Sequence, residues 1–199
     1  MEAPVFEEIY RDYLARVRTV DTAERAALLG VSAADGRIEI PLYNRTYTVT
    51  PEGIESPEGN KPHHAVSVIL CQYILLCPNS PATETELVTF KDFMDAAPFV
   101  GGFRNSAEAP IAKHFAGSMA SLEECAAKLG GKPCPTEVSC DLALRFPALP
   151  KVPIYLLFND EDDEFPADCT LLFQRGAEKH LDMECLAMLG GILAEWLKR

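Results

Sequence analysis

The chain has 199 residues, of which 48% are hydrophobic, so it is long enough to bury a core and too apolar to be disordered. Its 30 acidic and 18 basic residues give a net charge of −12, which argues against a nucleic-acid partner because phosphate binding requires a basic face. The most apolar stretch, residues 65–77, is shorter than the roughly 20 residues that span a bilayer, so we expect no membrane partner.

The start of the chain and its cysteines indicate a cytoplasmic location. Glu7 and Glu8 interrupt any apolar core of a secretion signal. The seven cysteines form an odd set without a Cys-x-x-Cys pair. Four of them lie in apolar periodic patterns, where cysteine acts as a small hydrophobe: Cys71, Cys125, Cys169 and Cys185. A reducing compartment fits this set better than a disulfide framework.

Two helices are predicted at the start of the chain. Apolar residues at helical spacing predict the first over residues 4–20. Asp21 with Glu24 forms the capping pattern of a second, shorter helix, and Gly30 provides its end.

A β-hairpin and a buried helix are predicted next. Apolar and polar residues alternate over 38–42 and 47–49, and residues 43–45 favour a tight turn between these strands. Residues 51–62 are rich in Pro, Gly and Glu and are predicted to form a loop. The apolar stretch 65–77 is predicted to be a buried helix.

The middle of the chain is predicted to be mainly helical. A short strand over 87–90 is followed by a helical turn at 91–94. Apolar residues then step by three or four from Ile111 to Leu129, which predicts a helix that Gly117-Ser118 divides in two.

The last third is predicted to contain three strands and a helix. Residues 138–146 alternate cleanly, as expected of a strand with one buried face, and apolar runs at 152–158 and 169–173 predict two more strands. The final helix carries an apolar stripe over 185–196, and we expect Trp196 at its end to be mostly buried.

This order of elements predicts an α+β fold rather than a doubly wound sheet, because regular alternation of strands and helices is absent. We expect a single domain over residues 1–199, with a largely antiparallel sheet, helices packed on one face and a C-terminal helix. The strand over 138–146 should lie beside the strand over 152–158.

The acidic run 160–164 is the most distinctive feature of the sequence. Five adjacent carboxylates repel one another unless water, a cation or a partner absorbs their charge. We expect these acids to project outward, and we expect Phe165 to turn inward and Pro166 to restrain the return to the next strand.

A divalent-cation site in this loop is the alternative interpretation, with Asp160, Asp162 and Glu164 as ligands. The run does not match an EF-hand, since the sixth position, which requires glycine, is Phe165 and the twelfth is Leu171.

Other chemical motifs are weak. The sequence lacks the glycine-rich phosphate-binding fingerprints, H-E-x-x-H and G-x-S-x-G, so no catalytic residue is identified and enzymatic activity stays open. Cys71 and Cys77 would face different sides of a helix, and Cys134 and Cys140 would lie roughly 20 Å apart along a strand. This spacing disfavours an iron–sulfur cluster in this chain, and no cofactor is predicted.

Several segments together resemble the family catalogued as domain of unknown function 3786, found mainly in anaerobic bacteria and archaea. They recur in order over nearly the whole chain, and the most specific is Asp162-Asp163-Glu164-Phe165-Pro166-Ala167. The others include Arg45-Thr46-Tyr47, Phe103-Arg104, Pro110-Ile111-Ala112-Lys113-His114-Phe115 and Leu171-Leu172-Phe173.

The resemblance implies a domain rather than a reaction, because that family has no established activity. Relatives tend to carry histidine at the position of Gln72 and aspartate at that of Gln174, so chemistry at those positions would be altered here.

We therefore expect a cytoplasmic, non-catalytic module that binds a protein or small-molecule ligand in anaerobic redox or one-carbon metabolism. The residues expected to bind a ligand or partner are Arg104, His114, Asp162, Asp163 and Glu164. The alternative is a divalent-metal-dependent enzyme that uses the acidic loop at 160–164.

Overall fold

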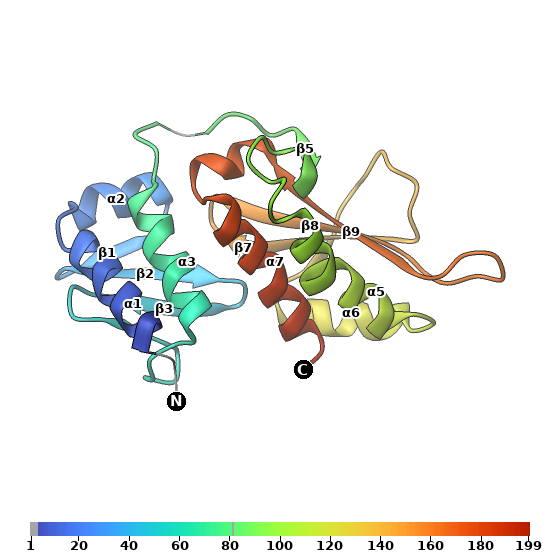
Figure 1. The fold of residues 1–199 in the computed structure, drawn as a ribbon, viewed down its shortest axis with the longest axis horizontal. Helices are drawn as coiled ribbons and strands as arrows, with labels where there is room; N and C mark the ends of the chain where they lie inside the picture. The colour runs from blue at the N-terminus through green and yellow to red at the C-terminus, as the bar shows by residue number, and fades with distance from the viewer. Residues whose placement is uncertain (1–3, 81) are drawn as a thin grey trace.

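The computed structural model describes residues 4–80 and 82–199, and over these residues the chain forms two antiparallel sheets (Figure 1). The first sheet has four strands in chain order: β1 (Ser32–Ala34), β2 (Arg37–Leu42), β3 (Arg45–Val49) and β4 (Ile54–Glu55). The second has five strands in the order β5 (Leu87–Thr89), β9 (Asp168–Gln174), β8 (Val152–Asn159), β7 (Leu142–Leu149) and β6 (Lys132–Pro133). The predicted α+β class with antiparallel pairing is confirmed.

Three helices accompany the first sheet: α1 (Pro4–Val17), α2 (Thr22–Leu29) and α3 (His64–Leu75). The predicted ends of α2 are confirmed. The Asp21 side chain accepts hydrogen bonds from the backbone N–H groups of Ala23 and Glu24, and Gly30 ends the helix with a left-handed φ of 70°.

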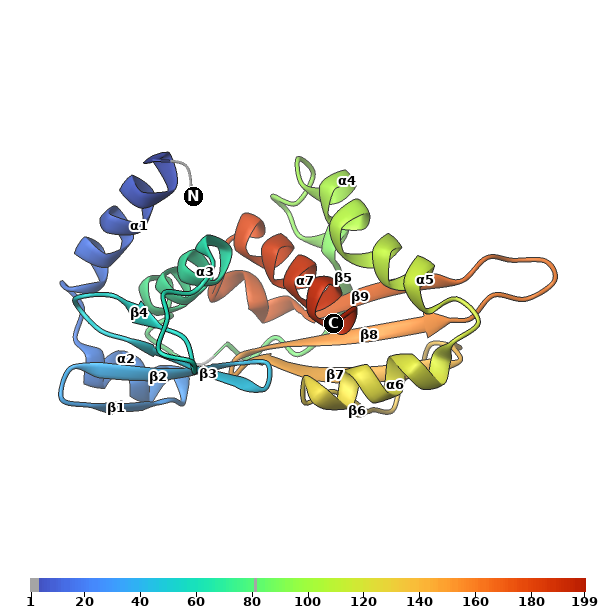
Figure 2. The ribbon, with the colours of Figure 1, turned by 90° about the horizontal axis from the view of Figure 1, so that it is seen from below.

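The helices of the second half are α4 (Val100–Phe103), α5 (Ala109–Phe115), α6 (Met119–Lys128) and α7 (Met183–Leu197), with short turns η1 (Phe90–Asp92), η2 (Arg104–Glu108) and η3 (Arg175–Lys179). The break predicted near Gly117 separates α5 from α6. Figures 1 and 2 show α5, α6 and α7 along one face of the five-stranded sheet. The strand β7 pairs with β8, as predicted for the segments 138–146 and 152–158.

The turn of the β2–β3 hairpin joins the two halves of the structure. Tyr43 is buried there with a positive φ of 53°, an uncommon conformation for a residue other than glycine. Its N–H donates to the Ala148 carbonyl at 2.9 Å, and its hydroxyl donates to the Leu189 carbonyl at 2.7 Å. One cluster of buried apolar residues accordingly includes side chains from both sheets.

Among residues 4–80 and 82–199, no helix combines the length and the apolar character needed to cross a bilayer.

One predicted strand needs correction. The strand predicted over 138–146 begins only at Leu142, because the Val138 N–H bonds to the Thr136 hydroxyl in a local turn and the Val138 side chain is 56% exposed. Trp196 is of intermediate exposure and packs against the core, which agrees with the expectation that it is mostly buried.

Phe165 is also placed differently from the prediction. The strands β8 and β9 pair as far as Asn159 and Asp168, and the loop between them extends beyond the helices that cover the sheet (Figure 2). Phe165 lies in this loop with 66% of its surface exposed, so the expected inward orientation is wrong.

This position of Phe165 predicts a contrast between two phenylalanines of one hairpin. Phe165→Ala should leave the free energy of unfolding within about 0.5 kcal/mol of the parent, because little apolar surface is lost. Phe158→Ala should cost about 3–5 kcal/mol, because this ring is fully buried. Urea unfolding measures both, and an equal loss of stability in the two variants would contradict the exposed position of Phe165.

A second contrast tests the packing of α7. A Cβ atom on Gly190 would lie 2.6 Å from the Phe103 ring, which is itself stacked on Phe90, whereas on Gly191 the nearest atom would be 3.8 Å away. Gly190→Ala should therefore cost about 1–3 kcal/mol through overpacking. Gly191→Ala, the matched control, should be neutral or stabilise by up to about 1 kcal/mol through helix propensity. Chemical denaturation measures the free energy of unfolding of both variants. Equal stabilities would contradict the close approach of Gly190 to the Phe103 ring.

Candidate functional site

The acidic loop is held in shape by its own carboxylates. Asp160 accepts hydrogen bonds from the N–H groups of Gly117 at 2.7 Å and Glu161 at 2.9 Å. Asp162 accepts from the N–H groups of Glu164 at 2.8 Å and Phe165 at 2.7 Å, and these bonds lower the pKa of the Asp162 carboxyl. Two of the five acids therefore stabilise the turn itself.

The loop gives the metal alternative no support. Over residues 4–80 and 82–199, no group of three or more His, Cys, Asp or Glu side chains is arranged to hold a metal ion. Asp160 and Asp162 direct carboxylate oxygens to backbone N–H groups, and Glu164 is exposed.

Arg104 lies at a different place from the acidic loop. It begins the π-helical turn η2 and lines a cavity of about 180 Å³ together with Glu108 and Lys91. The Glu108 carboxylate accepts a hydrogen bond from the Leu171 N–H at 3.0 Å, and burial raises its pKa.

His114 is exposed on α5, where its ring meets the edge of Phe115. Neither His114 nor Asp162, Asp163 or Glu164 lines the cavity of Arg104. The five residues expected to bind a ligand are thus not brought together there.

A larger cleft lies between the two halves, and we call it the inter-sheet cleft. Its volume is about 330 Å³, within the range of roughly 300–1,000 Å³ that is usual for small-molecule sites. The first half contributes β3, the loop after β4 and the first turn of α3; the second half contributes the end of α7. The lining residues are Arg45, Tyr47, Ser56, Glu58, Asn60, Lys61, Pro62, His63, Val66, Ile192, Glu195, Trp196 and Arg199.

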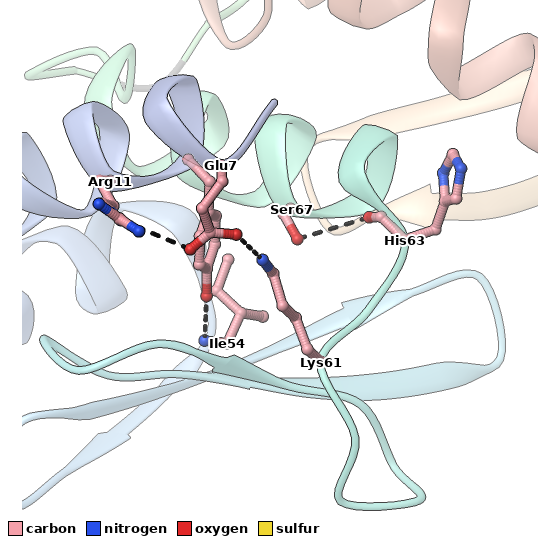
Figure 3. Close-up of polar contacts among 7 residues, drawn as sticks. Glu7, Arg11, Ile54, Lys61, His63 and Ser67 are labelled. Atoms are coloured by element: carbon pink, nitrogen blue, oxygen red, sulfur yellow. Dashed lines mark hydrogen bonds and ion pairs between the residues drawn. The ribbon is translucent and has the colours of Figure 1, made fainter. Parts of the chain in front are cut away.

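Three basic side chains line this cleft, and each meets a carboxylate. Arg45 pairs with Glu58, and Arg199 pairs with Glu195. Lys61 reaches from the loop to α1, where its Nζ lies 2.6 Å from Glu7 (Figure 3). These pairs are partly exposed, and such pairs contribute only about 0–1 kcal/mol each, so a ligand anion can replace a carboxylate partner at little cost.

The beginning of α3 adds positive potential to the cleft. His63 caps this helix, with its Nδ1 accepting a hydrogen bond from the Ala65 N–H at 3.4 Å, and its carbonyl accepts from the Ser67 hydroxyl (Figure 3). The first turn of α3 contains no acidic residue that would offset the partial positive charge of the helix N-terminus.

Aromatic rings form the apolar part of the wall. The Trp196 ring lies edge-on to Tyr43 with centroids 5.7 Å apart, and the Arg45 guanidinium lies 5.4 Å from the Trp196 centroid. Burial raises the pKa of Tyr47, so its phenol stays protonated at neutral pH and keeps its capacity to donate a hydrogen bond. The indole ring and the cation together form a surface for a flat, charged ligand.

Sequence reasoning did not identify the inter-sheet cleft. Its parts are separated by more than 100 residues, from Arg45 to Trp196, and the sequence gives no sign that these segments meet. His63 lies at the start of the predicted buried helix, but its place beside Lys61 depends on the path of the loop.

Comparisons with known proteins identify the family. No curated protein and no solved structure matches the chain. The family described as domain of unknown function 3786 matches residues 21–196, which include most of the cleft-lining residues. The chain therefore belongs to this family, whose function is not established.

Proposed function

We propose that the domain is a binding module for a small organic anion that also carries a flat apolar or aromatic part, and that the inter-sheet cleft is its site. The observation that carries this proposal is that Arg45, Lys61 and Arg199 line one cleft with the single tryptophan of the chain, whose ring centroid lies 5.4 Å from the Arg45 guanidinium. In a protein of net charge −12, a cleft whose lining has more basic than acidic side chains is a local exception that favours an anion.

The chemistry of the lining supports a ligand with two different ends. A carboxylate or phosphate group would exchange with Glu58 or Glu195 at the guanidinium groups, where bidentate hydrogen bonds are available. The flat part would pack on Trp196 and Ile192.

Three further expectations remain predictions. A cytoplasmic location and a setting in anaerobic redox or one-carbon metabolism rest on the sequence and on the family resemblance. Recognition of a protein partner through Asp162, Asp163 and Glu164 would use the exposed loop rather than the cleft. The divalent-metal enzyme is the weaker alternative, because the loop carboxylates are engaged with backbone N–H groups.

The position of Trp196 provides a direct test of ligand binding. Because it is the single tryptophan, its fluorescence reports on the cleft. Titration with a panel of aromatic carboxylates and aryl phosphates should give a saturable change for at least one compound, and its uncharged amide should bind much more weakly. Arg45→Gln should weaken binding by about tenfold or more, because a charge-assisted hydrogen bond is lost.

The control for this titration is Arg37→Gln, which removes the same charge from an exposed position of the same sheet and should keep the parent affinity. Equal binding of the acid and its amide, or an unchanged affinity in Arg45→Gln, would contradict an anion site in the cleft.

A further inference from the structure

A second, smaller cavity lies at the other end of α3, where the chain leaves this helix and crosses to β5 (Figure 1). Its volume is about 150 Å³, and both halves line it. Leu28 of α2 and Pro78 come from the first half and the crossing segment, and the turn between β7 and β8 contributes Lys151. We call it the junction cavity.

The junction cavity contains two basic side chains without an acidic partner. Over residues 4–80 and 82–199, neither Arg145 nor Lys151 forms an ion pair with a carboxylate. The Arg145 Nε donates only to the Tyr155 hydroxyl, at 3.4 Å. Glu84 also lines the cavity, but its carboxylate is paired with Lys179. Two unpaired cations around one small cavity repel each other, and an anion between them would relieve that repulsion.

A buried histidine with an unsatisfied nitrogen completes the wall. His180 is 3% exposed, and its Nδ1 has no hydrogen-bond partner among the residues that the structure describes. Buried polar atoms are rarely left in this state, because an unmade hydrogen bond is costly. The imidazole lies beside the Tyr73 ring, with centroids 6.0 Å apart, and the Tyr73 hydroxyl accepts a hydrogen bond from the Lys151 N–H at 3.0 Å.

The surroundings of His180 disfavour the protonated form of its imidazole. Burial first, and then Lys151 and Lys179, lower the pKa of this histidine. The titratable groups around it are Tyr73 of α3, Glu84 of the crossing segment, Arg145 and Lys151 of the β7–β8 hairpin, and Lys179 of η3. An anion in the cavity would reverse the effect of the cations and favour the protonated imidazole, which has two N–H donors.

We propose that the junction cavity binds a small free oxyanion of the size of sulfate or phosphate, held by Arg145 and Lys151, with His180 taking up a proton on binding. The volume favours a free ion over a whole metabolite, since it is about half the lower end of the usual range for small-molecule sites. This site is separate from the inter-sheet cleft and does not depend on the function proposed for that cleft.

Sulfate is the suitable probe, because its charge stays constant between about pH 5.5 and pH 8, whereas phosphate titrates in this range. Calorimetric titration should show tighter sulfate binding at the lower pH, by about tenfold for each unit by which bound sulfate raises the pKa of His180. NMR titration of the four histidines should show that sulfate raises the pKa of His180. His180→Gln should bind sulfate with an affinity independent of pH.

The double variant Arg145→Gln/Lys151→Gln should lose about tenfold or more in sulfate affinity. The double variant Arg37→Gln/Lys113→Gln removes the same charge from exposed positions elsewhere and should bind like the parent. Because Arg145 and Lys151 are exposed and unpaired, their replacement should leave the unfolding midpoint unchanged.

Two further measurements distinguish a free-ion site in the junction cavity from binding at the inter-sheet cleft and from binding of a larger molecule. Sulfate binding that is lost in Arg45→Gln but kept in Arg145→Gln/Lys151→Gln would assign the ion to the inter-sheet cleft and overturn the proposal. Binding of a phosphate monoester that is much tighter than that of sulfate or inorganic phosphate would show that the cavity holds a group of a larger molecule, which also overturns the free-ion assignment. If sulfate had no effect on the pKa of His180, the proposed role of this histidine in the junction cavity would also be overturned.

Discussion

One residue, Tyr43, connects the first half of the structure to two elements of the second. Its backbone N–H bonds to β7 and its hydroxyl bonds to α7. Burial raises the pKa of this phenol well above its ordinary value, so at neutral pH it stays protonated and donates this hydrogen bond. The left-handed conformation at Tyr43 costs free energy, and these contacts offset that cost.

This junction explains why the cavities lie where they do. The first sheet is covered by α1 and α3 and the second by α5, α6 and α7 (Figure 2). Between the halves α3 packs against α7 and β2 against β7, so the two halves share one buried core. Along the seam between the halves, polar side chains of both line the two cavities. Both the inter-sheet cleft and the junction cavity lie on this seam, as ligand sites between structural units commonly do.

The sequence predicted the local elements well, because their signals are local. Asp21 and Gly30 delimit α2 by capping, and the apolar run 152–158 corresponds to a paired strand. The sequence prediction was wrong where the exposure of a residue depends on which elements pack against its segment. Phe165 is apolar but lies in a loop beyond the helices that cover the sheet, and Val138 continues the alternating pattern of β7 but is exposed in a turn before that strand. The inter-sheet cleft was not predicted for a related reason, because its lining is assembled from distant segments, whereas the acidic loop is one continuous run of residues.

The buried thiols also bear on what chemistry this fold supports. Burial raises the pKa of Cys71 to about 12, and it raises the pKa values of Cys169 and Cys185 as well. A thiol acts as a nucleophile or metal ligand only as the thiolate, so these three side chains behave as small apolar residues of the core.

The two cavities differ in the way that α3 affects them. The N-terminus of α3 opens toward the inter-sheet cleft, so the helix dipole favours an anion there and adds to Arg45 and Lys61. The junction cavity lies near the opposite end, where the dipole alone would repel an anion. At that end the Arg25 guanidinium donates to the Cys77 carbonyl at 2.6 Å, which offsets the negative end of the helix. An anion in the junction cavity must therefore be held by side chains alone, which is why its affinity should depend so strongly on the protonation of His180, whereas the cleft retains a backbone contribution that no side-chain substitution removes.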